Sequence, residues 1–285
     1  MNHRSTPPLR RPALATQLAA WGLATMACTA PVCAQAFEVP AARSGPRNLF
    51  DIGLWQATQD HRVQAGLRNS TFSGGLGEAF SLESDFGLRR KSDITTLGYT
   101  RLIGLAWHLS VDRLENERRA TTATQRNLLI FGQTVPAGTV VSPTQRFSYT
   151  SVAGGLALLQ RGDTEFGVRF GGGSVRDRVR YQLPSASYQS NLLNADLLPL
   201  LGLFFSARPA ATLHVDARVD HLRERSSRST HLRAGLRWQP SPYIGVEAAY
   251  WRLSGTSTPD DDIFGGNEEG RYQLSGPRVA VRLAF

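Results

Sequence analysis

The stretch Arg278-Val279-Ala280-Val281-Arg282-Leu283-Ala284-Phe285 closes the chain with strict alternation. Large apolar side chains recur at every second position, and arginines or alanines fill the positions between them. Successive side chains of a β-strand point to opposite faces, so the stretch has one apolar face and one polar or small face. It therefore predicts a β-strand whose two sides meet different surroundings.

The same alternation returns along most of the 285 residues. It predicts strands over residues 49–67, 94–102, 105–114, 147–158, 164–178, 196–205, 212–222, 230–238, 243–253 and 272–285, while residues 80–88 are either a strand or a segment folded against the interior. The connections alternate between short ones, at 103–104, 160–163, 206–210 and 239–242, and longer polar ones, at 115–146, 179–195, 223–229 and 254–271. This rhythm predicts an antiparallel meander with its short turns at one end.

The strand over 212–222 shows the two faces most clearly. Its apolar series is Leu213, Val215, Ala217 and Val219, and its polar series is His214, Asp216, Arg218 and Asp220. No run after residue 36 reaches the ~18–20 apolar residues that a membrane-spanning helix needs. Two architectures fit such strands: a water-soluble β-sandwich, and a closed barrel with lipid outside and a polar interior. The two ends of the chain favour the barrel.

The N-terminus has the parts of a secretory signal peptide. Arginines open it, residues 13–27 are moderately apolar, and Ala34-Gln35-Ala36 is a small-x-small cleavage site. A disordered N-terminus and a lipoprotein signal at Cys28 are the alternatives, although Thr25 stands where a lipoprotein signal has an apolar residue. We expect a signal peptide over 1–36, a periplasmic linker over 37–47 and a barrel over 48–285. Cleavage removes Cys28 and Cys33, which leaves no thiol for a disulfide, a nucleophile or a metal.

The net charge of +9 comes almost wholly from arginine, because Lys91 is the one lysine. The arginines are spread singly along alternating segments, whereas a nucleic-acid-binding protein gathers them on one patch. We therefore expect no nucleic-acid partner. An anionic lipopolysaccharide surface and an interior that needs ion pairs account better for the arginines.

The alternation, the short-turn and long-loop rhythm and the terminal Arg282-Leu283-Ala284-Phe285 resemble small Gram-negative outer-membrane β-barrels, broadly of the outer membrane protein A and outer membrane protein W type. Residues 80–88, FSLESDFGL, also resemble a Leu-Glu-Asp-Asp-Leu-Gly-Leu segment of poorly characterised members. The resemblance implies a bacterial outer-membrane location, with Phe285 as the assembly signal. It also implies outer-membrane lipids and lipopolysaccharide, the barrel-assembly machinery and periplasmic chaperones as partners.

The strand count predicts an all-β, transmembrane, antiparallel up-and-down barrel of about ten strands, with eight or twelve as alternatives. Aromatic residues near strand ends predict girdles at the membrane interfaces, with interior packing as the alternative for each; they are Trp55, Trp107, Tyr149, Trp238, Tyr243, Tyr250 and Trp251. Charges of both signs on neighbouring strands predict an interior network of His214, Asp216, Arg218, Asp220, Arg233, Arg237, Glu247, Arg278 and Arg282, with Glu165 and Arg169 beside it.

Three groups of residues bear on chemistry. His108, Ser110 and Asp112 share one strand face and hold the parts of a serine hydrolase, and a His-x-Ser pattern on a barrel strand is also a feature of outer-membrane lipid A deacylases. The favoured interpretation is a polar strand that faces the lumen, where a lipid substrate does not reach these residues. Asp220 and His221 resemble half of an omptin-type protease site, but neighbours on a strand point to opposite faces. Asp260, Asp261 and Asp262 with Glu268 and Glu269 are a calcium-binding loop or, on the favoured interpretation, a solvated surface loop.

These patterns favour a structural or binding role at the cell envelope, with or without passage of small solutes. A narrow channel that prefers anions is the first alternative, and an outer-membrane hydrolase of deacylase or omptin type is the second. No cofactor and no metal site is expected, and a non-enzymatic role is favoured over an enzymatic one.

Overall fold

The computed structural model describes residues 46–66, 79–104, 106–130, 133–182, 187–224, 227–257 and 267–285. The predicted signal peptide over 1–36 and residues 37–45 of the predicted linker lie outside these ranges. Within them, no helix has the length and apolar content needed to cross a membrane.

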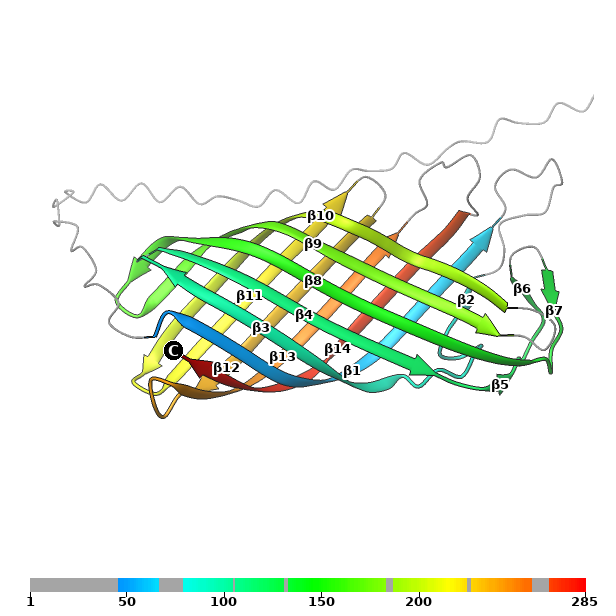
Figure 1. Cartoon of the computed structure of the whole chain (residues 1–285), viewed down its shortest axis with the longest axis horizontal. Helices are drawn as coiled ribbons and strands as arrows, with labels where there is room; N and C mark the ends of the chain where they lie inside the picture. The colour runs from blue at the N-terminus through cyan, green and yellow to red at the C-terminus, as the bar shows by residue number, and fades with distance from the viewer. Residues whose placement is uncertain are drawn as a thin grey trace, which may run out of the picture. The chain divides into compact units, whose positions relative to one another are not determined.

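Ten long antiparallel strands form a closed ring in the described part of the chain (Figure 1). In ring order they are β1 (Asn48–Gly66), β3 (Lys91–Ile103), β4 (Trp107–Arg119), β8 (Val140–Arg161), β9 (Thr164–Gln182), β10 (Ser187–Ala210), β11 (Leu213–Glu224), β12 (Ser227–Trp238), β13 (Ile244–Ser257) and β14 (Asn267–Ala284). Each strand pairs with the next, and β14 pairs with β1. Short strands β2 (Phe80–Ser81), β5 (Thr122–Ala123), β6 (Leu128–Ile130) and β7 (Gln133–Val135) lie near one end. The predicted ten-stranded up-and-down barrel is confirmed.

The ring closes along the seam between β1 and β14. At its end, the Asn48 N–H donates to the Phe285 carbonyl at 3.0 Å, and the Phe285 N–H donates to the Asn48 carbonyl at 2.9 Å. The pairing is interrupted beside Gly276, where a Cβ atom would lie 2.0 Å from the Gln56 carbonyl oxygen. The Gly276 carbonyl in turn accepts the Trp55 indole N–H at 3.1 Å. Only glycine allows this approach of the two backbones.

An apolar belt surrounds the outside of the barrel near one end. Leu54 on β1, Leu201 on β10 and Val279 on β14 are 63%, 68% and 58% exposed, while their strand neighbours Trp55 and Arg278 are buried. The turn residues 104, 106, 162–163, 211–212 and 239–243 lie at this end with the C-terminus, and we call it the C-terminal rim. A closed ring with an apolar exterior is the structure that satisfies its backbone in a bilayer. The other end is the loop end.

The strands continue past the belt toward the loop end and are longer than predicted. Strand β9 runs to Gln182 and β10 starts at Ser187, so the predicted loop over 179–195 is wrong. The predicted loop over 223–229 is wrong for the same reason, and β4 and β8 take up both ends of the one over 115–146. Most outward side chains in these extensions are polar, as at Arg119 and Arg146, and Val140 is an exposed exception. The alternation between outward apolar and inward polar residues ends before these extensions, although the strands continue through them.

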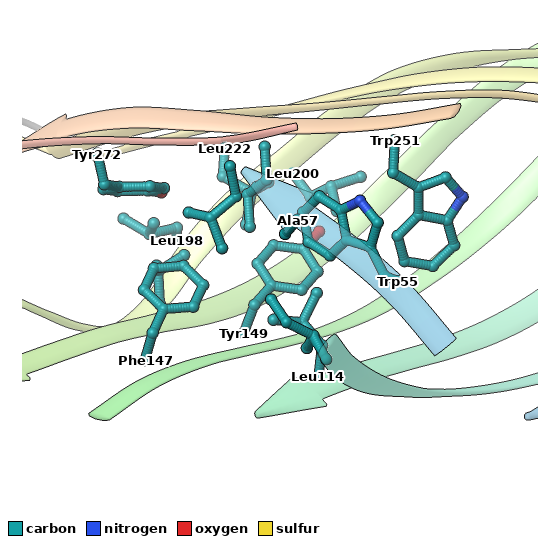
Figure 2. Packing of buried hydrophobic residues seen from close by; sticks show 14 of the residues in the cluster. Trp55, Ala57, Leu114, Phe147, Tyr149, Leu198, Leu200, Leu222, Trp251 and Tyr272 are labelled. Atoms are coloured by element: carbon teal, nitrogen blue, oxygen red, sulfur yellow. The ribbon is translucent and has the colours of Figure 1, made fainter. Parts of the chain in front are cut away.

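The interior is packed with apolar side chains at mid-height. We call the following buried residues the core layer: Trp55, Ala57, Ile94, Leu114, Phe147, Tyr149, Ala153, Val175, Leu198, Leu200, Leu222, Trp251, Leu253, Tyr272 and Leu274. Figure 2 shows Tyr272, Leu222 and Trp251 meeting Phe147, Tyr149 and Leu114 from opposite walls. The ring centroids of Trp55 and Trp251 are 5.8 Å apart. In a barrel of this size, side chains fill the bore.

This packing corrects the predicted aromatic girdles. Trp55, Tyr149 and Trp251 are buried in the core layer, so their assignment to a membrane interface is wrong. The other four predicted girdle residues lie on the outside of the barrel; they are Trp107, Trp238, Tyr243 and Tyr250. The alternation along a strand separates its two faces but does not say which face meets lipid. An aromatic residue on either face therefore fits the same pattern.

Residues 80–88 form an internal segment that we call the plug. It pairs with Arg62 and Val63 of β1 through β2 and then turns, and Leu82, Phe86 and Leu88 are buried. These side chains pack with lumen-facing residues of β1, β8 and β9 and with residues of β6 and β7; the partners are Val63, Val141, Val179, Tyr181, Leu128 and Val135. Of the two predictions for this stretch, the structure shows the one in which it folds against the interior.

Candidate functional site

A layer of ion pairs fills the interior between the core layer and the C-terminal rim. We call it the charge layer. On the seam side, Arg282 contacts Asp51 through Nε–Oδ1 at 2.6 Å and Nη2–Oδ2 at 3.0 Å, a bidentate pair. Arg278 Nη1 lies 2.7 Å from Glu247 Oε1, and its Nε donates to the Thr96 hydroxyl at 2.8 Å. Arg282 also approaches Glu247, at 3.6 Å. Each carboxylate here either contacts two arginines or accepts two hydrogen bonds from one arginine.

The opposite side of the charge layer centres on Arg218 of β11. Its Nη2 lies 2.8 Å from Asp112 Oδ2, and its Nε lies 3.0 Å from Asp220 Oδ2. Arg169 of β9 donates from Nε to Asp220 Oδ1 at 2.8 Å. Arg233 of β12 stands 3.8 Å from Asp112. The carboxylates thus join arginines from three strands.

The other residues predicted for this network are placed as follows. Arg237 Nη1 lies 3.1 Å from Asp216 Oδ2, and the Ser206 hydroxyl donates to Asp216 Oδ1 at 2.9 Å. His214 is half-buried and pairs in register with Arg237. Glu165 is half-buried on β9. Among the nine residues of the predicted network, eight take part in the ion pairs that the structure describes.

The layer also includes Asp51, which the sequence interpretation missed. Its strand carried the signal, because Ile52 and Leu54 alternate with it and face outward. Asp112 was considered only as part of a catalytic triad. In the structure it serves instead as the shared partner of Arg218 and Arg233.

The three candidate hydrolase residues on β4 face the interior but do not make a relay. The Ser110 hydroxyl is buried and donates to the Ala153 carbonyl at 3.2 Å. His108 Nε2 lies 3.3 Å from Arg169 Nη1, and its ring lies 4.8 Å from the Phe204 ring. A general base must reach the hydroxyl proton that it removes, and here that proton points to a backbone oxygen.

Asp220 and His221 lie on opposite faces of β11, as neighbours on a strand do. Asp220 is fully buried between Arg169 and Arg218. His221 is exposed, and its Nδ1 lies 3.0 Å from the Thr230 hydroxyl on the outside. The structure therefore does not bring these two candidate residues together.

A second polar cluster holds the plug, and no prediction covered it as a group. Glu83 of the plug lies 2.8 Å from Arg118 Nη2 and 3.1 Å from His61 Nδ1, and it accepts the His61 backbone N–H at 2.9 Å. His61 Nε2 lies 3.6 Å from Asp177, whose other oxygen accepts the Gln145 amide at 2.8 Å. We call these five residues the plug latch. They come from β1, β4, β8, β9 and the plug, so their separation along the chain hid the cluster.

The plug latch holds the Glu83 carboxylate in the charged form. Burial acts to raise the pKa of Glu83, but the hydrogen bond from His61 and the charges of His61 and Arg118 lower that pKa to about 2. Asp85 also has a lowered pKa: burial acts to raise it, but the hydrogen bond from Arg126, the backbone N–H of Ser81 and the charge of Arg126 together more than offset that effect. Both plug carboxylates are thus ionised at neutral pH and tied to cations of the barrel wall or its loops.

Metal binding finds no support in the part of the chain that the structure describes. There, no group of three or more His, Cys, Asp or Glu side chains is placed to hold a metal ion. The acidic residues Asp260, Asp261 and Asp262 lie outside the described ranges, and Glu268 and Glu269 belong to β14. The predicted surface loop therefore stays a prediction.

Comparison with known proteins gives a fold and no family. No protein-family model and no curated protein matches the chain. The outer membrane protease OmpT from Escherichia coli is similar in structure, with a TM-score of 0.53 and 9% identity over 84% of this chain and 97% of that one. The translocator domain of the autotransporter NalP from Neisseria meningitidis has a TM-score of 0.44 and 11% identity, over 84% of this chain and 89% of that one.

At such identities the likeness concerns the fold alone. It does not specify the outer membrane protein A or W type. The ring of strands, the outward belt and the likeness to the protease structure agree with the predicted location in a bacterial outer membrane. The chain therefore has the closed β-barrel fold that Gram-negative outer-membrane proteins such as this protease have.

Proposed function

We propose that the protein is a sealed outer-membrane barrel with a structural and surface-binding role. The observation that carries this proposal is the core layer, which crosses the bore with fully buried side chains such as Trp55, Tyr149 and Leu198. The charge layer lies on one side of it and the plug on the other. Because three successive layers of packed side chains fill it, the interior has a structural role. The outer surface and the loops are then the regions that bind other molecules.

The charge layer supports the same proposal through its energetics. Its arginines are buried and paired with carboxylates, as at Arg282 with Asp51 and Arg278 with Glu247. Removing one member of a buried pair costs about 3–5 kcal/mol, because the other charge stays unpaired. A conducting path along this layer requires such pairs to open, so the pairs oppose ion passage.

Single-channel recording in planar bilayers tests the proposal. Purified full-length protein is expected to give no discrete conductance steps, and a general porin in the same bilayers shows that insertion is detected. The Glu83→Gln variant, which loosens the plug, is also expected to stay silent, because the core layer lies beneath the plug. Its matched control is Glu117→Gln, which removes a carboxylate from the outer surface of β4. Reproducible steps from the wild type overturn the sealed barrel.

A narrow channel that prefers anions is the second candidate, and the plug is the observation that favours it. The plug is not one of the ten ring strands: it pairs with β1 through the short strand β2, and ion pairs such as Glu83 with Arg118 and Asp85 with Arg126 hold it. Conductance that appears in Glu83→Gln and is absent from Glu117→Gln would support this channel against the sealed barrel. Anion preference in that current would reflect the arginines of the charge layer.

A hydrolase is the third candidate and has the weakest support, because Ser110 donates to a backbone carbonyl. Incubation of the purified protein with lipid A and with peptides, followed by mass spectrometry, is expected to leave both unchanged. Cleavage that His108→Ala abolishes would establish the hydrolase and contradict the proposal.

A further inference from the structure

Four arginines from four consecutive strands gather on the outside of the barrel near the loop end. They are Arg62 of β1, Arg271 of β14, Arg252 of β13 and Arg228 of β12, and we call them the arginine face. They line a depression of about 410 Å³ together with Asp60, Thr230, Ser254, Gly255, Thr256, Tyr272 and Gln273. With one acidic residue among these lining residues, the side chains carry a net charge of 4 − 1 = +3.

The register of the strands sets these like charges against one another. Arg62 and Arg271 are direct partners across the seam between β1 and β14. Thr256 of β13 pairs with Arg271 on one side and with Arg228 on the other, so three arginines follow one row across four strands. Like charges directly opposite on a sheet destabilise it. An anion bound between them removes that repulsion.

The arginine face also lacks the carboxylate partners that the interior arginines have. Arg228 donates to the Thr256 hydroxyl at 2.9 Å, and Arg252 donates to the Gln273 amide oxygen at 3.3 Å, both neutral groups. Arg62 stands 3.7 Å from Asp60, and both side chains are more than half exposed. Arg271 forms no ion pair with the residues that the structure describes. Most of the donors on these four guanidinium groups therefore remain for a ligand.

The position of the arginine face identifies the class of that ligand. Outward residues on the same strands become apolar toward the C-terminal rim, at Leu54, Leu232, Tyr250 and Val279. Arg252 is two residues from Tyr250, a distance of about 7 Å along a strand. A single amphiphile can thus lay its acyl chains on the belt and place its anionic head among the arginines.

We propose that the arginine face binds the phosphate groups of a phosphorylated glycolipid in the outer leaflet of the membrane. The guanidinium forks match phosphate oxygens in bidentate geometry. The hydroxyls of Thr230, Ser254 and Thr256 stand among the forks to bond further phosphate or sugar oxygens. The inference deepens the surface-binding part of the proposed function and rests on its outer-membrane placement, with the loop end at the cell exterior.

The test measures binding of fluorescent lipid A to the full-length protein in a neutral detergent. The variant is Arg62→Gln/Arg228→Gln/Arg271→Gln. Each lost charge-assisted contact is worth about tenfold in affinity, so we expect at least a tenfold loss. The matched control is Arg113→Gln/Arg119→Gln/Arg146→Gln, which removes three exposed arginines that pair with Glu115 or Glu117 on another wall. It should bind within about twofold of wild type, because charges on another wall are screened from this face.

Two further ligands test whether the arginine face recognises phosphate on a lipid or free phosphate. Dephosphorylated lipid A is expected to bind as weakly as the triple variant, and inorganic phosphate is expected to compete only at millimolar levels. Equal binding by wild type and the arginine-face variant overturns the proposal, as does equal binding of phosphorylated and dephosphorylated lipid. If inorganic phosphate binds as tightly as lipid A, the site is one for a free anion. Failure of the sealed barrel is seen separately, as bilayer conductance with lipid binding unchanged.

Discussion

Glu83 and Arg118 meet at 2.8 Å inside the barrel, although one belongs to the plug and the other to strand β4 of the wall. Both side chains are almost fully buried, at 1% and 4% exposure. The Arg118 guanidinium also donates to the Arg89 carbonyl at 2.8 Å, just beyond the plug, and to the Gln145 amide oxygen. One arginine thus binds the plug at Glu83, binds the residue that follows the plug, and connects both to β8.

Loss of this pair is expected to free the plug without unfolding the ring. In Glu83→Gln, hydrogen exchange at the amides of Leu82, Asp85 and Leu88 should accelerate by about tenfold or more, because one charged hydrogen bond contributes about 1.5–3 kcal/mol. Exchange mass spectrometry of residues 80–88 measures it. The core-layer strands and the Glu117→Gln variant should keep wild-type rates. Unchanged exchange in the plug would show that its apolar contacts hold it alone.

The same carboxylate gives the plug a defined dependence on pH. The pKa of Glu83 lies at about 2 in the folded protein, below its usual value of 4.5. A lowered pKa means that the stabilisation is complete above pH 4.5 and is lost as the pH falls from 4.5 toward 2. The difference in melting temperature between wild type and Glu83→Gln should therefore be constant from pH 7 to about 5 and shrink below that. A constant difference down to pH 2.5 would contradict this assignment.

The bidentate pair of Arg282 and Asp51 is expected to respond to single and double substitution in opposite ways. Arg282→Met leaves Asp51 buried without its partner and should cost about 3–5 kcal/mol of unfolding free energy, measured by urea titration in micelles. Adding Asp51→Asn should restore a large part of that loss. Arg119→Met, which breaks an exposed pair with Glu117, should cost less than about 1 kcal/mol. If the double variant is no more stable than Arg282→Met alone, the unpaired charge of Asp51 is not the cause of the lost unfolding free energy.

Of the four tryptophans in the barrel, two face outward and two face the interior. Trp107 and Trp238 are about half exposed on the outside, and Trp55 and Trp251 are buried in the core layer. In vesicles of brominated lipid, fluorescence quenching should vanish in Trp107→Phe/Trp238→Phe. It should persist in Trp55→Phe/Trp251→Phe. The reverse result would place the interior aromatics at the membrane interface, as the sequence alone had predicted.

Gly276 is expected to tolerate no side chain. A Cβ atom there lies 2.0 Å from the Gln56 carbonyl oxygen, so Gly276→Ala must move the backbone of β1 or β14 and should cost about 1–3 kcal/mol. Gly154→Ala is the control, since its Cβ meets the Phe170 ring at an ordinary 3.4 Å. Melting temperatures of the two variants compare them. Equal stability would mean that the seam absorbs the added methyl group.

The sequence predicts the ring well because a bilayer imposes a regular chemical pattern on it. Leu213 and Val215 alternate with His214 and Asp216, and that period alone assigns the strand and its lumen side. The loop-end extensions escaped prediction because both faces are wet or mixed there, as around Arg146 on β8. Without a lipid-facing series, a strand and a polar loop look alike.

The clusters could be predicted only in part. Ion pairs among adjacent strands follow from the alternation, so the partners Arg278 and Glu247 were expected in one network. The plug latch joins His61, Glu83, Arg118 and Asp177, and their meeting depends on how residues 80–88 turn inward. No periodicity encodes that turn. The arginine face needed the register of four strands, which fixes which outward arginines are neighbours.

The seam has a consequence for how the protein is made. Its two partners, β1 and β14, are separated by nearly the whole barrel sequence, and translation finishes β14 last. Until then β1 has an open edge, and open strand edges invite aggregation. The ring therefore cannot close before all ten of its strands have been synthesised.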